Sequence, residues 1–238
     1  MTGRYNFRNY TQFGALPAAE PTFGHMMQDA GYATCIVGKW QLEGKGGTTP
    51  DRAGFDEYYM YSGKGSHHAD PDILDNDWAN AQHKEGAYGP DLAVEYLCDF
   101  VGRHREEPFF AYYPMILPHF PFMPTPDSPA WESENRLARH DKYFADMVEY
   151  MDKLVGRIVS KLEELGIREN TLIVFLGDNG THPSQNSQFR GKPFRGGKSF
   201  LTSAGTHVPL IVNWKGKVEG GRVFDDLVDP TDFFVTIA

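Results

Sequence analysis

The sequence has few cysteines and no long apolar run. Its two cysteines, Cys35 and Cys98, cannot build a disulfide-rich scaffold in a chain of 238 residues. Each lies among apolar residues, which favours two buried thiols over a disulfide. No stretch approaches the roughly 18 apolar residues of a membrane-spanning helix, so we expect no membrane partner. The first residues also lack the apolar block of a secretion signal.

Basic side chains are in deficit. The chain has 23 lysines and arginines against 32 aspartates and glutamates, a formal net charge of −9. A net-negative surface is not drawn to polyanions, so we expect no nucleic-acid partner. Apolar material is plentiful, at 40% hydrophobic and 14% aromatic residues. This composition is far from that of disordered proteins and predicts a globular protein with one or two cores.

Four short apolar runs predict buried strands, because they are rich in β-branched or aromatic residues and lack polar alternation. They are residues 33–37, 109–113, 171–176 and 208–212. Helices are predicted over 21–31, 90–105 and 136–166, the last from apolar residues at spacings of three and four that end at Gly166. Alternating strands and helices predict an α/β sandwich with a mainly parallel sheet.

Two long segments without periodicity, 41–89 and 177–206, follow predicted strands. Long irregular segments in compact domains usually carry function. In open α/β sheets, ligands bind beyond the carboxyl ends of the strands. We therefore expect a functional site at this edge of the sheet.

Asp178 and Asn179 directly follow the strand predicted at 171–176, between two glycines. A carboxylate and an amide oxygen side by side suit a hard cation such as Ca²⁺ or Mg²⁺. Taken alone, the same residues are more often a plain turn. The neighbouring strand ends favour the metal-ligand interpretation.

Two lysines and a histidine stand at other predicted strand ends. Lys198 closes a basic, glycine-rich loop that can bring cations and backbone amides to an anion, and Lys39 follows the strand at 33–37. His119 lies between two prolines that fix its backbone, so its imidazole can donate to an anion or act as a general acid. A solvated turn, a solvent-reaching lysine and a packed histidine are the respective alternatives. With Asp178 and Asn179, these residues describe a site for an oxyanion ester.

An ordered set of motifs resembles the sulfatases of the alkaline-phosphatase-like superfamily. The motifs are Thr2-Gly3-Arg4-Tyr5, Ala30-Gly31-Tyr32-Ala33-Thr34, Gly38-Lys39-Trp40, Gly54-Phe55-Asp56, Pro118-His119-Phe120-Pro121-Phe122, Gly177-Asp178-Asn179-Gly180, Arg195-Gly196-Gly197-Lys198 and Val208-Pro209-Leu210-Ile211-Val212. Each is weak alone, but their order along the whole chain is specific. The resemblance implies a three-layer α/β sandwich with a mainly parallel central sheet.

The resemblance also implies a mechanism. Sulfatases attack the sulfur with the hydrate of a formylglycine, made from the cysteine or serine of a C/S-x-P-x-R motif, while a divalent cation and cationic side chains neutralise the sulfate oxygens. By this resemblance Asp178 and Asn179 are metal ligands for Ca²⁺ or Mg²⁺. Lys39 and Lys198 bind the sulfate, and His119 contacts the ester and assists the leaving group.

The chain departs from the family pattern in three ways. Gln41 stands where the family has a histidine that handles the formylglycine hydroxyl, and glutamine hydrogen-bonds but cannot act as a base. The tandem aspartates and the nucleophile motif precede Thr-Gly-Arg-Tyr in the family, and no C/S-x-P-x-R occurs here. The family's small C-terminal subdomain is also absent. We therefore expect residues 1–238 to be the interior of a single sulfatase catalytic domain, lacking the first strand and that subdomain, and to be inactive alone.

Several alternatives and partners follow. A phosphodiesterase or phosphonate hydrolase is the enzymatic alternative, because phosphate and sulfate esters need similar cationic clamps, and a non-catalytic binder of sulfated ligands is the other. The resemblance implies a sulfate ester substrate, with a sulfated sugar as one such class, and a periplasmic or secreted location. An open strand edge predicts self-association.

Overall fold

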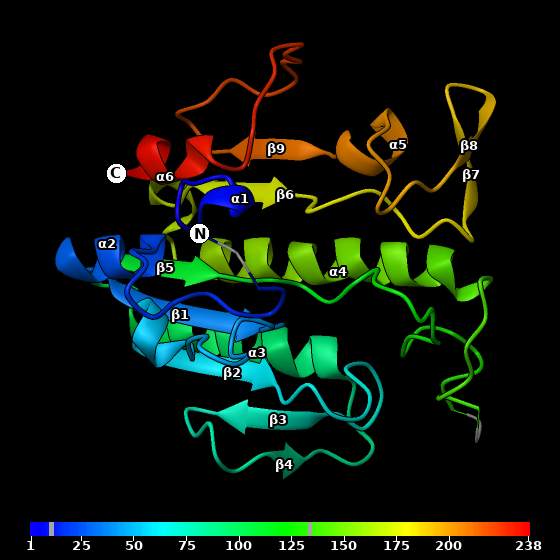
Figure 1. Ribbon diagram of the computed structural model, residues 1–238, viewed down its shortest axis with the longest axis horizontal. Helices are drawn as coiled ribbons and strands as arrows, with labels where there is room; N and C mark the ends of the chain where they lie inside the picture. Colours follow the sequence, from blue (N-terminus) through cyan, green and yellow to red (C-terminus); the bar gives the residue numbers. More distant parts are fainter. Residues whose placement is uncertain (10–11, 133–134) are drawn as a thin grey trace. The chain divides into compact units, whose positions relative to one another are not determined.

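The computed structural model describes residues 1–9, 12–132 and 135–238, and the chain divides into two compact units (Figure 1). The first unit comprises residues 1–116 and 223–238, and the second comprises residues 117–222. Each unit is described by itself. Within the described residues, no helix is both long and apolar enough to cross a membrane.

A five-stranded mixed sheet forms the centre of the first unit. Its strands, in spatial order, are β4 (Gln82–His83), β3 (Asp72–Asp75), β2 (Glu57–Tyr61), β1 (Ala33–Gly38) and β5 (Phe109–Tyr112). The central strand β1 is parallel to both neighbours, with Cys35 opposite Glu57 on β2 and Ala111 on β5. Strands β3 and β4 continue the sheet in antiparallel fashion. The α/β class predicted from the sequence is confirmed.

Helices pack on both faces of the first-unit sheet. Successive side chains of β2 point to opposite faces, so each face offers apolar groups to a helix. Tyr58 and Met60 join a buried cluster against which Phe23 of α2 (Phe23–Asp29) packs. On the opposite face, Tyr59 stacks on Tyr96 of α3 (Gly89–Arg103), with ring centroids 4.7 Å apart. Burying each such aromatic side chain stabilises the fold by roughly 1.5–3 kcal/mol.

The Gly54-Phe55-Asp56 motif holds α2 against the start of the sheet. Gly54 has a φ of 86°, and a Cβ there would overlap the backbone of α2. Phe55 is buried in the core. The Asp56 carboxylate accepts hydrogen bonds from the backbone N–H and the hydroxyl of Thr34, each 2.8 Å long. The motif therefore serves packing, and its conformational demands explain its residue types. Shorter helices α1 (Asn6–Asn9), η1 (Asp51–Ala53) and α6 (Asp232–Ile237) complete the first unit.

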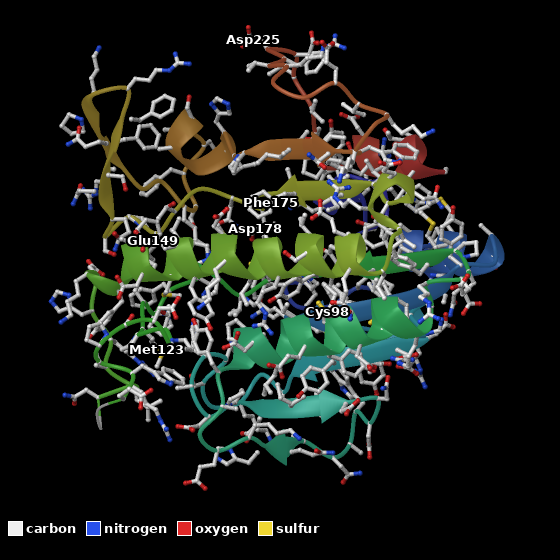
Figure 2. All side chains as sticks on the ribbon, turned by 180° about the vertical axis from the view of Figure 1, so that it is seen from behind. Cys98, Met123, Glu149, Phe175, Asp178 and Asp225 are labelled. Atoms are coloured by element: carbon white, nitrogen blue, oxygen red, sulfur yellow. The ribbon has the colours of Figure 1, made fainter. Side chains whose placement is uncertain are left out.

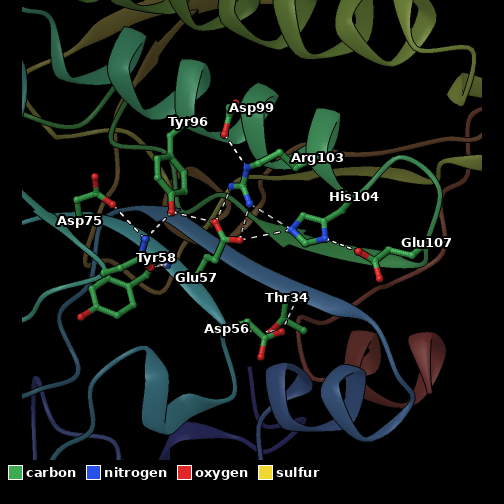
Figure 3. Close-up of polar contacts among 11 residues, drawn as sticks. Thr34, Asp56, Glu57, Tyr58, Asp75, Tyr96, Asp99, Arg103, His104 and Glu107 are labelled. Atoms are coloured by element: carbon green, nitrogen blue, oxygen red, sulfur yellow. Dashed lines mark hydrogen bonds and ion pairs between the residues drawn. The ribbon is translucent and has the colours of Figure 1, made fainter.

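An ion-pair network fixes the end of α3 to the start of β2 (Figure 3). Arg103 donates to both carboxylate oxygens of Glu57, at 2.7 and 2.6 Å, and also to Asp99 at 2.8 Å. The hydroxyl of Tyr96 donates to the same Glu57 carboxylate at 3.1 Å. These hydrogen bonds, above all those from Arg103, lower the pKa of Glu57 to about 2. The carboxylate is thereby held in its charged form.

The second unit contains one long helix and two strand pairs. Its elements are α4 (Tyr143–Glu164), η2 (Arg168–Asn170), β6 (Ile173–Leu176), β7 (Asn186–Phe189), β8 (Lys192–Arg195), α5 (Ser203–Thr206) and β9 (Leu210–Asn213). Strand β6 pairs antiparallel with β9, and β7 pairs antiparallel with β8. The apolar stripe of α4 buries Met147 and Leu154 completely.

Two predictions for this unit are wrong in detail. The helix predicted from residue 136 begins at Tyr143, because the preceding residues turn back and the His140 N–H donates to the Phe122 carbonyl. The strands predicted as buried are partly exposed: Val174 on β6 is 40% exposed and Ile211 on β9 is 56% exposed. These strands form only a two-stranded ladder, which leaves apolar side chains of both strands uncovered. Neither cysteine forms a disulfide within the described residues, as predicted, and Cys35 is buried, whereas Cys98 is only half-buried, contrary to the prediction of two buried thiols.

Candidate active site

The loop after β6 places Asp178 and Asn179 at the carboxyl end of that strand (Figure 2). Two backbone hydrogen bonds fix the loop, from Gly177 N–H to the Pro209 carbonyl at 3.0 Å and from Gly180 N–H to the Gly205 carbonyl at 2.9 Å. A Cβ on Gly180 would overlap the Ala204 carbonyl, so the two loops touch backbone to backbone. Asp178 is exposed and Asn179 is half-buried, which leaves the carboxylate open to a ligand.

Lys198 and His119, predicted separately from the sequence, lie together. The Lys198 backbone N–H donates to the Thr181 carbonyl at 2.9 Å, which ties its loop to the one carrying Asp178 and Asn179. Its ammonium nitrogen Nζ lies 3.2 Å from Nε2 of His119. Three strand-end loops of the second unit therefore meet through backbone and side-chain hydrogen bonds.

The hydrogen bonds of His119 select one tautomer of its imidazole. Nδ1 bonds to the Phe120 carbonyl, which can only accept, so Nδ1 carries the proton. Nε2 faces the Lys198 ammonium, which can only donate, so Nε2 accepts. His119 is thus neutral in this arrangement, with a basic nitrogen beside a cation. An arriving sulfate can accept from Lys198 and release Nε2 for proton transfer.

His182 lies beside the loop of His119, although no sequence motif points to it. Its ring stacks on Phe120, next in sequence to His119, with centroids 4.5 Å apart and planes 14° from parallel. Its Nδ1 accepts from the Ser184 backbone N–H at 3.2 Å, so the neutral ring carries its proton on Nε2. The only sequence signal was its position three residues after Asn179, which does not reveal a stack with a residue 62 positions earlier.

Lys39 and Gln41 lie in the first unit, directly after β1. Gly38 turns the chain there with a φ of 115°, and the Lys39 N–H donates to the Pro114 carbonyl at 2.9 Å. Trp40 is buried and donates its indole N–H to the Thr48 carbonyl at 2.9 Å. Lys39 is half-buried and Gln41 is exposed, and both stand beyond the carboxyl end of β1 as predicted.

Tyr61 marks the same edge of the first-unit sheet and was missed because it lies in an apolar run. It is the last residue of β2, is 3% exposed, and its hydroxyl has no hydrogen-bond partner among the described residues. Burial raises its pKa well above the usual value, so the hydroxyl stays protonated. His67 packs against its ring at 5.2 Å between centroids.

The donor chemistry of Asp178 and Asn179 fits part of a Ca²⁺ or Mg²⁺ site. Both ions take oxygen ligands, six or more in number, and these two side chains offer carboxylate and amide oxygens. Within the described ranges, no group of three or more histidine, cysteine, aspartate or glutamate side chains is arranged to hold a metal. The pair therefore fits a hard cation whose other ligands come from elsewhere, and its role stays a prediction.

The α/β fold and the strand-end loops that carry Lys198, His119, Asp178 and Asn179 can be compared with those of known proteins. The model of the Sulfatase family matches residues 1–238, and the chain belongs to this family. It is 29% identical to N-acetylgalactosamine-6-sulfatase of Canis lupus familiaris over 99% of its length and 48% of the relative's. It is also 29% identical to an arylsulfatase of Hemicentrotus pulcherrimus, covering 98% of this chain and 44% of the relative. The chain thus spans about half the length of these curated relatives.

Solved structures support the same fold. The crystal structure of Ps i-CgsB superposes with a TM-score of 0.81 at 25% identity, covering 98% of this chain and 58% of that one. A second structure of that protein, in complex with k-i-k-neocarrahexaose, gives a TM-score of 0.80 with the same identity and coverage. The PsFucS1 sulfatase from Pseudoalteromonas sp. gives a TM-score of 0.74 at 22% identity, covering 99% of this chain and 55% of that chain. The alkaline-phosphatase-like fold is thereby confirmed.

Proposed function

We propose that the whole protein hydrolyses sulfate esters, with the second unit contributing its ester-binding cations. The observation that carries this proposal is the 3.2 Å contact between Lys198 and His119, because the Lys198 loop is hydrogen-bonded to the one bearing Asp178 and Asn179. A cation, a neutral imidazole and a metal-ligand pair are the groups that transfer of a charged sulfuryl group needs. Membership of the sulfatase family supports the same reaction.

The metal ligands in this chain are Asp178 and Asn179, and the ion is Ca²⁺ or Mg²⁺. When bound, the ion neutralises charge on the sulfate oxygens. The Asp178 side chain is exposed, and backbone hydrogen bonds fix its loop before any ion arrives. In the family pattern, tandem aspartates that precede the Thr-Gly-Arg-Tyr motif would supply further ligands to the ion.

In the proposed reaction, residues of this chain bind the sulfate group and protonate the leaving oxygen. Lys198 donates to a sulfate oxygen, and Lys39 does the same from the loop after β1. Once a sulfate oxygen accepts from Lys198 in its place, Nε2 of His119 takes up a proton from solvent, and the leaving oxygen takes that proton as the sulfur–oxygen bond of the ester breaks. In the family pattern the nucleophile would be the hydrated formylglycine of a C/S-x-P-x-R motif, and Gln41 could hydrogen-bond its hydroxyl but could not act as its base.

The substrate class we propose is a sulfated sugar. The curated relatives include an N-acetylgalactosamine-6-sulfatase, and the Ps i-CgsB relative has been crystallised with a neocarrahexaose. Their names describe those proteins, and at 25–29% identity they support the class of substrate for this chain. A periplasmic or secreted location belongs to the same proposal, because polymers of sulfated sugars lie outside cells.

Residues 1–238 are, on this proposal, the interior of a single catalytic domain that is inactive alone. The share of the relatives that the chain covers supports this. The exposed apolar side chains of β6 and β9 support self-association of the isolated chain. Light scattering at high concentration tests it, and a strictly monomeric mass contradicts it.

The experiment that tests the function compares sulfate and phosphate esters. The full-length protein, with and without Ca²⁺, is assayed with a chromogenic aryl sulfate, an aryl phosphate diester and a sulfated monosaccharide. We expect turnover of the sulfates only, and its loss with EDTA and recovery with Ca²⁺ or Mg²⁺. Turnover of the phosphate diester alone contradicts the proposal. If the protein binds the sulfated sugar without hydrolysing it, and Gln41→His restores hydrolysis, the protein is a non-catalytic binder.

A further inference from the structure

A short hairpin, strands β7 and β8, carries an unusual concentration of positive charge. Between Asp178 and Glu219 the sequence has six lysines and arginines and no acidic residue, although the whole chain has a net charge of −9. Three of the six, Arg190, Lys192 and Arg195, lie on the hairpin. All eight strand residues of the hairpin are exposed. Unpaired cations gathered on one exposed element raise the local concentration of anions.

One face of the hairpin combines aromatic rings with cations. Lys192 lies opposite Phe189, and Phe194 opposite Ser187, so the alternation of side chains places these residues on one face. The rings of Phe189 and Phe194 have centroids 5.7 Å apart and are 55% and 40% exposed. At the turn, the Arg190 guanidinium lies 5.2 Å from the centroid of the Phe189 ring. Phenylalanine exposed to this degree usually marks a binding surface when it occurs in groups.

The hairpin cations have no anionic partner within residues 1–9, 12–132 and 135–238. Among the residues that the structure describes, Arg190 and Lys192 form no ion pair, and Arg195 bonds only to the Pro183 carbonyl, at 2.9 Å. By contrast, Lys153 pairs with Asp127 and Lys215 with Glu163 in the same unit. The hairpin cations thus keep their charge-assisted donors available for an external anion.

The hairpin grows directly out of the candidate active site. Strand β8 ends at Arg195, three residues before Lys198. At its base, the Gly196 N–H donates to the Gln185 carbonyl and the Gln185 N–H donates to the His182 carbonyl, at 2.9 and 3.0 Å. Four strand residues extend about 13 Å, which is longer than one sugar ring. A polymer whose ester lies at Lys198 and His119 can therefore continue along the hairpin.

We propose that the β7–β8 hairpin binds the sugar residues next to the one that is hydrolysed, and that these residues carry sulfate groups of their own. Arg190 and Lys192 bind the additional sulfates, and Phe189 and Phe194 pack on the apolar faces of the sugar rings. The inference rests on the proposed function and adds to it that the substrate is a multiply sulfated oligosaccharide or polymer. Strand addition by a protein partner is disfavoured, because Pro193 interrupts the donors of a four-residue strand.

The test uses binding and turnover with ligands of two lengths. The full-length protein and its Arg190→Gln/Lys192→Gln variant are titrated with a heparin hexasaccharide, its desulfated counterpart and a sulfated monosaccharide. We expect the variant to bind the sulfated hexasaccharide about tenfold more weakly, with a smaller salt dependence, because two charge-assisted contacts are lost. Turnover of an aryl sulfate should be unchanged. Phe189→Ser should weaken hexasaccharide binding without changing the salt dependence.

The matched control is Lys215→Gln/Lys217→Gln, which removes the same charge beyond the opposite end of β9. If it weakens binding as much as the hairpin variant, general electrostatics explain the affinity and the proposal is wrong. Equal affinity of wild type and hairpin variant for the hexasaccharide overturns it too. Tighter binding of single-stranded DNA or polyglutamate than of the hexasaccharide assigns the hairpin to another polyanion.

The outcomes for the hairpin and for the proposed function are separable. If the aryl sulfate is hydrolysed but the hairpin variant binds the hexasaccharide normally, the function stands and this inference fails. If no sulfate is hydrolysed but the hairpin variant loses hexasaccharide affinity, the hairpin is a sulfated-glycan site and the hydrolase proposal fails.

Discussion

Arginine is used in two opposite ways in the two units. In the first unit, Arg103 is surrounded by carboxylates, with Glu57 and Asp99 both within 2.8 Å. In the second, Arg190 and Lys192 project from a hairpin with no carboxylate partner among the described residues. Paired charges hold elements of the fold together, whereas unpaired charges on an exposed element remain available to a ligand. The same contrast separates residues whose loss should affect stability from residues whose loss should affect binding.

We expect the largest effect from removing Lys198, the cation of the candidate site. Lys198→Ala in the full-length protein should lower kcat/KM for a sulfate ester by at least about 10³-fold, because a preorganised cation at developing charge is lost. The melting temperature should change little, since Lys198 pairs with no carboxylate among the described residues. Steady-state kinetics and thermal unfolding measure the two effects. Lys215→Ala serves as the matched control, and an equal loss of activity in it contradicts the assignment.

Breaking the paired arginine should have the converse effect. Glu57→Gln should lower the free energy of unfolding by about 1–2 kcal/mol, because it removes the charged acceptor of Arg103, whose 43% exposure lets solvent screen part of the pair. Glu106→Gln, which removes an 86% exposed partner of Arg105, should cost less than about 0.5 kcal/mol. Urea unfolding of both variants measures this. Equal stability of the two variants speaks against a structural role for Glu57.

Lowering the pH should remove the difference in unfolding free energy between the wild type and the Glu57→Gln variant. The pKa of Glu57 is lowered from 4.5 to about 2 by Arg103, so its stabilising contribution is complete above about pH 4.5. It is lost progressively as the pH falls towards 2, because the folded protein must then take up the same proton as the unfolded chain. Unfolding free energies of both proteins at pH 6, 4 and 3 should converge. A constant difference across this range contradicts the lowered pKa.

The smallest expected effect concerns His182, which supports the site without an ion pair. His182→Gln removes the stack on Phe120 and should lower kcat/KM about three- to tenfold, through a less well-ordered His119. His182→Phe keeps a flat ring and should restore most of the activity. A merely structural loss would instead appear as a lower melting temperature with normal kinetics. His207→Gln, on the loop that follows α5, is the control.

The sequence predicted local features well, because they depend on short patterns. The strand at Ala33–Gly38 follows from a continuous apolar run and the helix Gly89–Arg103 from apolar periodicity. The places of His119 and Lys198 follow from the loops in which they lie. Features that depend on distant partners were not accessible. The Glu57–Arg103 pair joins residues 46 positions apart, and the His182 stack joins two loops.

The burial of side chains in one region could also not be predicted from the sequence. The run Leu172–Leu176 has the composition of a core strand, yet Val174 is 40% exposed in the structure. Composition states what a strand can bury, whereas the neighbours that cover it are set by topology. The roles of Asp178, Asn179, Lys39 and Gln41 remain predictions for the same reason, because metal and ester binding depend on groups that approach from other parts of the protein.

The glycines at the base of the hairpin divide the loop into constant and exchangeable parts. Gly180, Gly196 and Gly197 each touch backbone from a facing loop, so no side chain can be added at these positions without moving the site. Beyond them, Gly191 at the turn has open space around it. The β7–β8 hairpin can therefore be exchanged, whereas the glycine-containing loops at its base cannot. Hairpins from related proteins can be grafted between Gln185 and Gly196 to alter ligand selectivity while the loop that carries Lys198 stays in place.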